Sequence, residues 1–125
     1  MTTNLVPVAS IELDGAGRKV SVATFAEADR AIAEMVGETE IRYVLIYQDG
    51  FTYAGKIAHG EGLAAHLRHF LEVMAGVKRP RGVTSMEYRA QLEEIDLYRP
   101  GQRAECRRFL ETYEIGDVPK QGAKP

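Results

Sequence analysis

The clearest strand-like run of hydrophobic residues lies in the middle of the chain. Two β-rich runs, residues 41–48 and 51–58, flank an Asp-Gly pair at 49–50 that best fits a two-residue hairpin turn. A turn of this length sets Gln48 opposite Phe51, and this register decides which side chains share a face of the hairpin.

The predicted register gives the central hairpin two apolar faces. On the face predicted to be the core side lie Val44, Ile46, Phe51, Tyr53 and Ile57. On the opposite face lie Ile41, Tyr43, Leu45 and Tyr47. Because this second face is unusually apolar and aromatic for a surface in water, we expect more of the chain or a partner to cover it.

An earlier hairpin and a helix are predicted before the central hairpin. The alternating runs Val8–Leu13 and Arg18–Val22 flank a glycine-rich turn and indicate two strands. Thr24 and Glu27 have the capping-box spacing, which predicts a helix from about Phe25 to Val36.

Three further helices are predicted after the central hairpin. A run with helical spacing from Leu63 to Ala75 stops at Gly76. A second capping box starts a helix over residues 85–98, and a last helix is expected from Gln102 to about Glu114.

The helix over residues 85–98 has two apolar edges. One edge holds Tyr88, Leu92 and Ile95, and the other holds Met86, Ala90 and Leu97. We therefore expect this helix to lie between the body of the protein and something else, for which the last helix is the simplest candidate.

These elements predict an α+β fold in the order ββαββααα, with an antiparallel sheet of two β-hairpins, packed helices and a C-terminal helical pair. We expect residues 1–76 to form the sheet domain, residues 77–115 the helical pair packed on it, and residues 116–125 a flexible tail.

Composition favours a cytoplasmic protein. The chain has 125 residues, 45% of them hydrophobic, and the single Cys106 cannot form an internal disulfide. We expect no membrane-spanning run and no secretory signal. A formal net charge of −2 argues against a strongly basic nucleic-acid binder.

No residue pattern points to catalysis. His59, His66 and His69 are poorly placed to share a metal, and the CxxC and HExxH motifs are missing. Cys106 falls on an apolar stripe and is interpreted as a small core residue. We therefore expect neither enzymatic activity nor a metal or cofactor, although an enzyme with an unrecognised site stays a third hypothesis.

Two basic clusters are the candidates for nucleic-acid binding, because phosphate binding needs several convergent cations. The first cluster is Lys78, Arg79 and Arg81, and the second is Arg99, Arg103, Arg107 and Arg108. They bracket one helix, so we expect any nucleic-acid binding to be weak and sensitive to salt.

Within residues 40–76, the chain places Asp49, Gly50, Tyr53, Gly55 and Lys56 at the end of the sheet segment, followed by a helix that ends in Ala75-Gly76. With this pattern the segment resembles the large polyvalent protein-associated domains, small α+β domains in proteins of phages and conjugative elements. The resemblance implies an origin in a mobile genetic element and no established enzymatic chemistry.

We therefore expect an interaction protein of a phage or plasmid, most plausibly a counter-defence (anti-CRISPR or anti-restriction) inhibitor that binds and inactivates a host CRISPR–Cas or restriction complex. The expected partner surface is the aromatic hairpin face with Tyr43, Tyr47 and Lys56, extended by Arg79 and Arg81. The alternative is a DNA-processing or conjugation accessory protein that uses the basic loops. The oligomeric state stays open.

Overall fold

The computed structural model of the protein describes residues 5–37 and 40–117, and all eight predicted elements are present in it. In chain order they are β1 (Val8–Gly15), β2 (Arg18–Val22), α1 (Phe25–Glu34), β3 (Ile41–Tyr47), β4 (Thr52–Ile57), α2 (Leu63–Ala75), α3 (Ser85–Tyr98) and α4 (Gln102–Thr112). The α+β fold class and the order ββαββααα are confirmed.

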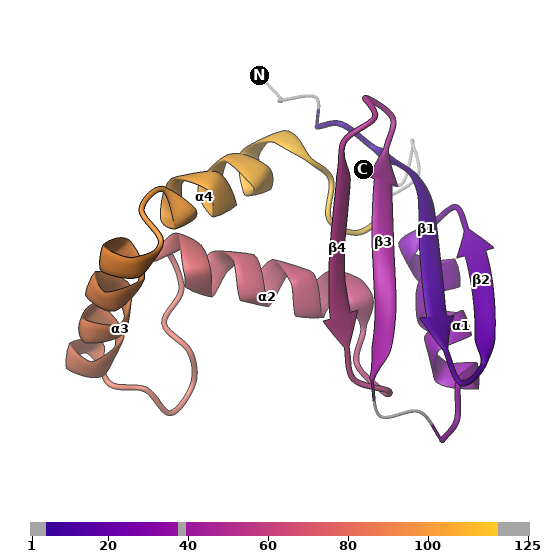
Figure 1. The fold of residues 1–125 in the computed structure, drawn as a ribbon, viewed down its shortest axis with the longest axis horizontal. Helices are drawn as coiled ribbons and strands as arrows, with labels where there is room; N and C mark the ends of the chain where they lie inside the picture. Colours follow the sequence, from indigo (N-terminus) through magenta and orange to yellow (C-terminus); the bar gives the residue numbers. More distant parts are fainter. Residues whose placement is uncertain (1–4, 38–39, 118–125) are drawn as a thin grey trace, which may run out of the picture.

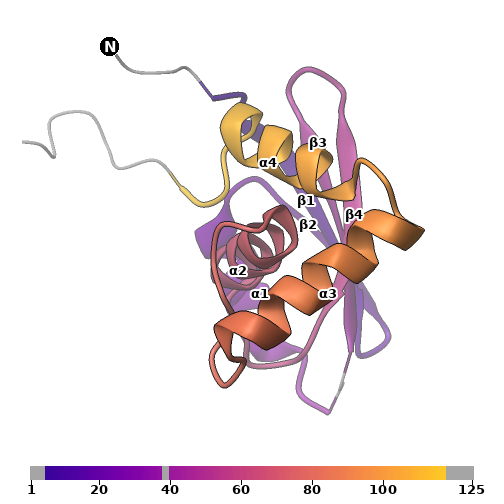
Figure 2. The same ribbon diagram turned by 90° about the vertical axis from the view of Figure 1, so that its left-hand side faces the viewer.

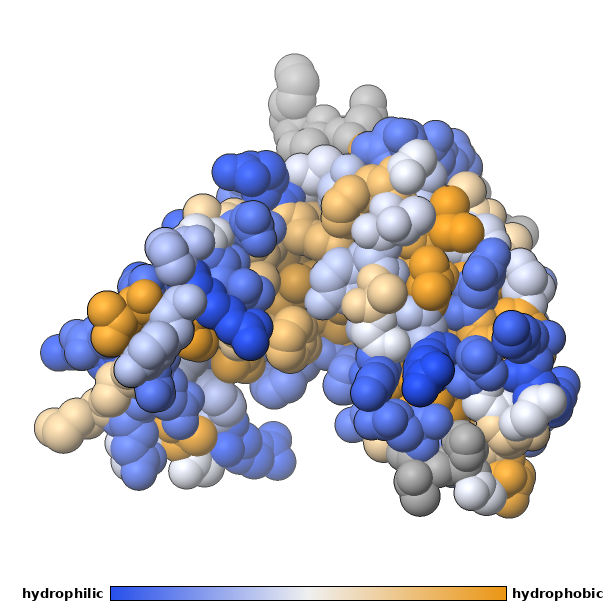
Figure 3. Space-filling model, in the orientation of Figure 1, coloured by the Kyte–Doolittle hydropathy of each residue, from blue (hydrophilic) through white to orange (hydrophobic). Residues whose placement is uncertain are grey.

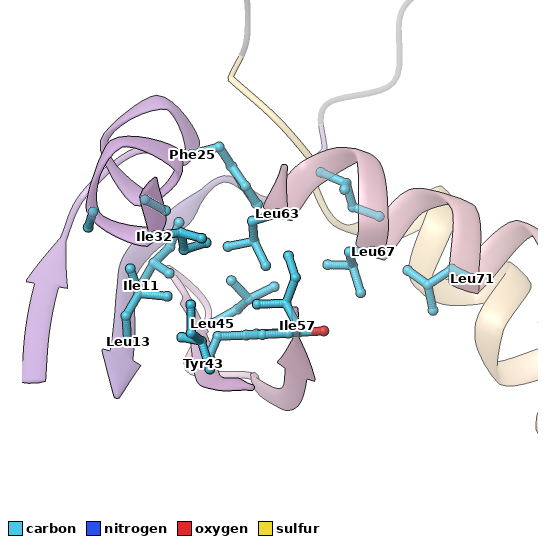
Figure 4. Close-up of a cluster of buried hydrophobic side chains, with 14 of the residues drawn as sticks. Ile11, Leu13, Phe25, Ile32, Tyr43, Leu45, Ile57, Leu63, Leu67 and Leu71 are labelled. Carbon is cyan, nitrogen blue, oxygen red and sulfur yellow. The ribbon is translucent and has the colours of Figure 1, made fainter. Parts of the chain in front are cut away.

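The four strands form one antiparallel sheet in the order β2-β1-β3-β4. Pairing of β1 with β3 joins the two predicted hairpins edge to edge. Helices α1 and α2 pack on one face of this sheet (Figure 4). Within residues 5–37 and 40–117, no helix lies on the other face, which is called the open face below.

The last three helices extend away from the sheet. Helix α2 runs out past the edge strand β4, α3 crosses the far end of α2, and α4 returns beside α2 toward the sheet (Figures 1 and 2). Helix α4 packs mainly on α2, and it adds Cys106 and Phe109 to the same core that the sheet builds.

The core lies between the sheet and helices α1, α2 and α4. Figure 4 shows strand side chains pointing toward α1 and α2. The most deeply buried side chains of the core are Ile11, Leu13, Ile32, Met35, Ile41, Leu45, Tyr47, Ile57, Leu63, Leu67 and Leu71. Leucines at 63, 67 and 71 recur every fourth residue, which places one stripe of α2 on the sheet.

The turn of the central hairpin is one residue longer than predicted. The amide of Tyr47 donates to the carbonyl of Phe51 at 2.8 Å, so Gln48, Asp49 and Gly50 together form the loop. Gly50 has φ of 92°, the left-handed conformation that closes a three-residue hairpin loop. The predicted pairing of Gln48 with Phe51 is therefore wrong.

The longer loop reverses the predicted faces of β3. Since side chains alternate along a strand, a shift of one residue moves every side chain to the other face. Tyr43 and Leu45 point into the core, whereas Val44 and Ile46 lie on the open face. Of the five side chains predicted to form the core side, only Ile57 is buried.

Both predicted capping boxes are confirmed, at Thr24 with Glu27 and at Thr84 with Glu87. The start of α1 has a further partner that is distant in sequence. The carboxylate of Asp117 accepts from the amides of Phe25 at 2.9 Å and Ala26 at 2.8 Å. The first amides of α1, which have no partner within the helix, are thereby satisfied.

The C-terminal segment after α4 is held against the sheet as well. Val6 pairs with Tyr113 in a parallel bridge, and the Tyr47 hydroxyl donates to the carbonyl of Glu114 at 2.8 Å. Within the segment predicted to be a flexible tail from residue 116, the side chain of Asp117 bonds to α1, and residues 118–125 lie outside the described residues. Helix α4 ends at Thr112, earlier than expected, because the chain extends to reach Val6.

Replacing Asp117 with alanine should lower the free energy of unfolding by about 1–2 kcal/mol, because two helix amides lose their acceptor. Asp117→Asn keeps one side-chain carbonyl oxygen as an acceptor, so the decrease in its free energy of unfolding should be about half as large. Urea unfolding measures both values. Asp14→Ala, on the open face, is the control, with a change within about 0.5 kcal/mol. A stability of Asp117→Ala equal to that of the original chain would rule out this cap.

Candidate functional site

Tyr43 and Tyr47 do not lie on a partner surface. Their exposed fractions are 3% and 1%, so the prediction that they contact a partner is wrong. The ring of Tyr43 lies across Gly55, where an added Cβ would come within 2.5 Å of the hydroxyl oxygen. Burial raises the pKa of both tyrosine hydroxyls.

An aromatic cluster joins the central hairpin to α4. Its members are Tyr47, Phe51, Tyr53, Phe109 and Tyr113. Phe51 stacks on Tyr113 with ring centroids 4.7 Å apart, and Phe109 meets the edge of Tyr53 at 5.0 Å. The aromatic face is therefore covered by the protein's own C-terminal helix and the segment that follows it.

The remaining predicted partner residues are not gathered with these tyrosines. Lys56 projects from β4 on the open face and lies 3.6 Å from the carboxylate of Glu40. Arg79 and Arg81 belong to the loop between α2 and α3, beyond the edge of the sheet. The five residues thus lie in three separate places and form no single surface.

Helix α3 carries strongly exposed apolar side chains outside the core. Met86 is 81% exposed and Leu97 is 72% exposed, and both point in nearly the same direction about three turns apart. Tyr98, at the end of the helix, is 73% exposed. Because Tyr98 lies about 100° round the helix from Leu97, only Met86 and Leu97 are called the outer face of α3. Figure 3 shows the separate lobe that α3 forms, with apolar patches among polar side chains.

The inner edge of α3 attaches it to the body. Tyr88 is buried, and its hydroxyl donates to the carbonyl of Val73 in α2 at 2.6 Å. Asp96 accepts two hydrogen bonds from the guanidinium of Arg103 in α4, at 3.0 and 2.5 Å. The predicted two-edged helix therefore has one edge on the body, and α4 does not cover the other.

The first basic cluster surrounds one hollow in the surface. The loop between α2 and α3 and a histidine in the middle of α2 border an open hollow of about 910 Å³, lined by His69, Lys78, Arg79, Pro80, Arg81, Gly82, Val83 and Thr84. Within this loop the amide of Val83 donates to the carbonyl of Pro80 at 3.3 Å, and the guanidinium of Arg79 donates to the carbonyl of Val83 at 3.0 Å. The hollow is called the basic hollow below.

The second basic cluster is partly used inside the protein. Arg103 is bound to Asp96, and Arg107 donates to the carbonyl of Ala75 at 3.1 Å, where it helps to terminate α2. Arg99 and Arg108 are exposed. The residues that line the basic hollow include none of these arginines, so the two clusters do not converge.

In residues 5–37 and 40–117, no group of three or more His, Cys, Asp or Glu side chains could hold a metal ion. His66 lies 3.3 Å from Glu61, and His69 lines the basic hollow. Cys106 is buried, as predicted, and burial raises the pKa of its thiol. None of the described helices is both long and apolar enough to cross a membrane.

His69 is the member of the basic hollow that the sequence did not predict. It lies in α2, well before Lys78 in the chain, and it was considered only as a metal ligand. A signal was present, because helical spacing places His69 away from the buried stripe of Leu67 and Leu71. The path of the following loop, which brings the cations to this histidine, cannot be derived from that spacing.

No protein-family model, curated protein sequence or solved structure shows a significant match to this chain.

The buried tyrosines predict a loss of stability in alkaline solution. In the folded protein the pKa of each hydroxyl lies above the unfolded value of about 10, so folding favours the neutral tyrosine. The resulting stabilisation is complete below about pH 10, and it is lost progressively as the pH rises above that value. Each tyrosine should contribute a decline of up to about 1.4 kcal/mol per pH unit. Urea unfolding at increasing pH should show a weaker decline for the double variant Tyr43→Phe/Tyr47→Phe.

The matched control for the alkaline experiment is Tyr98→Phe, which changes an exposed hydroxyl of α3. Its stability should decline with pH as steeply as that of the original chain. If the double variant declines just as steeply, then Tyr43 and Tyr47 are not protected from ionisation by the core.

Proposed function

We propose that this protein is a non-enzymatic interaction protein that acts by stoichiometric binding, with the outer face of α3 in contact with its partner. The observation that supports this proposal is the exposure of Met86 and Leu97 on a helix that projects from the body. Large apolar side chains grouped on an exposed surface are typical of protein–protein contacts.

The way α3 is held also supports a role in binding. Tyr88 and Asp96 fix the helix to α2 and α4 through its inner edge, so the outer face is presented before any partner arrives. A prearranged surface binds more tightly because less conformational entropy is lost on association. Helix α3 thus presents Met86 and Leu97 on one side, about three turns apart, with the exposed Arg89 and Glu93 between them, so the proposed contact surface is mixed apolar and charged.

For the partner, we propose a host defence complex in the cytoplasm, of the CRISPR–Cas or restriction type. This part of the proposal rests on the resemblance of residues 40–76 to domains of phage and conjugative-element proteins. Inhibitors that work by occupying a surface need contact area and no reactive group, which suits the exposed outer face of α3.

A titration tests the proposed inhibition. Purified CRISPR–Cas effector complexes and restriction enzymes would be incubated with increasing amounts of this protein, and cleavage of target DNA would be measured. Stoichiometric binding predicts that inhibition of one of these enzymes is complete near an equimolar ratio. Inhibition at a large excess of enzyme over this protein would show turnover instead. Loss of inhibition after this protein alone is treated with a chelator, which is removed before the assay, would show dependence on a metal.

The double variant Met86→Gln/Leu97→Gln tests the outer face of α3. Glutamine keeps helix propensity but removes the apolar contacts, so the affinity for the inhibited enzyme should fall about thirtyfold or more. The melting temperature should change by no more than about 2 °C, because both side chains are exposed.

Val36→Gln is the matched control, because Val36 is 76% exposed but lies next to α1, far from α3 in the chain. This variant should inhibit as the original chain does. Full inhibition by the α3 double variant at an unchanged equivalence point would place the partner surface elsewhere.

A further inference from the structure

We infer that the basic hollow is a phosphate-binding site for a single nucleic-acid strand. The site consists of His69 from α2 with Lys78, Arg79 and Arg81 from the loop between α2 and α3. This inference does not depend on the outer face of α3, since none of the residues that define that face lines the hollow.

The loop that carries the cations has a defined shape. Gly82 has φ of 83°, which lets the chain reverse from Pro80 to Val83 in a hydrogen-bonded turn. One guanidinium nitrogen of Arg79 closes this turn by donating to the carbonyl of Val83. The remaining guanidinium donors of Arg79 are available to a ligand, and Arg81 lies within the turn itself.

The hollow has an excess of positive charge, which favours the binding of an anion. All of the charged side chains among its lining residues are basic. Two acidic groups that contact lining residues are engaged within the protein, because Glu72 lies 3.9 Å from Lys78 and Glu87 accepts from the amide of Thr84 at 2.9 Å. The ion pair of Lys78 is exposed and long, so it offers little resistance to a competing phosphate.

The chemistry and the size of the site favour a nucleic-acid strand. Guanidinium groups match the oxygens of a phosphate in a two-point hydrogen bond. From Lys78 to Arg81 the chain can span at most about 11 Å, so the patch can meet only a short run of about three phosphates, all on one strand. On the basis of this small size, we assign the site to a single strand.

Fluorescence anisotropy with a labelled thymidine oligonucleotide of about 20 nucleotides tests the site. About three phosphate contacts on a single strand give a slope of about −2 in log K against log salt, so affinity should fall about twentyfold from about 50 mM to about 200 mM salt. Absence of binding at the lower salt concentration, or binding that salt does not weaken, would overturn the inference.

The variant Lys78→Gln/Arg81→Gln removes two of the cations and leaves the bond from Arg79 to Val83 in place. Its affinity at low salt should fall about tenfold or more. Its salt dependence should become shallower, with a slope between about −1 and zero. The control Arg99→Gln/Arg108→Gln makes the same change in net charge in the second basic cluster and should stay within about twofold of the original chain.

If Lys78→Gln/Arg81→Gln and Arg99→Gln/Arg108→Gln lose affinity for the oligonucleotide equally, binding follows net charge, and the inference of a defined site is refuted. Two competitors separate the ligand classes, namely vesicles that contain phosphatidylserine and poly-glutamate at the same charge concentration. If either binds as tightly as the oligonucleotide, the assignment to a nucleic-acid strand is wrong. Melting temperatures of both variants equal to that of the original chain confirm that the comparison concerns binding alone.

Discussion

In β3 the side chains of Ile41, Tyr43, Leu45 and Tyr47 all point toward the helices, and the rest of the structure depends on this orientation. Strand β3 pairs with both β1 and β4, so its register decides which faces of both neighbours are buried. The ring of Tyr43 fills the space above Gly55, where a larger residue would collide with it. A shift of one residue would bring the charged Arg42 into the core at a prohibitive cost.

Elements that depend on neighbours in sequence could be predicted from the sequence, and those that depend on distant contacts could not. Both capping boxes and the glycine that ends α2 act within one turn of a helix, so their signals are local. The predicted length of the central hairpin loop was wrong because Asp-Gly fits loops of both two and three residues, and packing against the helices decides between them. Gly55 was the available signal, since glycine within a strand indicates that a bulky side chain covers it.

The candidate surfaces also have a part that could be predicted from the local sequence and a part that depends on distant contacts. Helical periodicity alone predicted the two edges of α3, and composition alone identified the basic loop. Which cations converge is a matter of tertiary structure, because Arg103 and Arg107 hold helix ends in place whereas Lys78 and Arg81 line a hollow. Both surfaces lie at the end of the molecule farthest from the sheet, so changes there leave the core intact (Figure 1).

The C-terminal segment completes contacts that the N-terminal part begins. Asp117 holds the start of α1, and Tyr113 pairs with Val6. During synthesis on the ribosome, the first hairpin and α1 emerge long before these partners do, since a chain is made from its N-terminus. The capping box of Thr24 and Glu27 can form at once, but the amides of Phe25 and Ala26 gain their acceptor only after residue 117 has left the exit tunnel. Until then the apolar face of the sheet stays partly uncovered, and this interval is when binding by a chaperone would matter most.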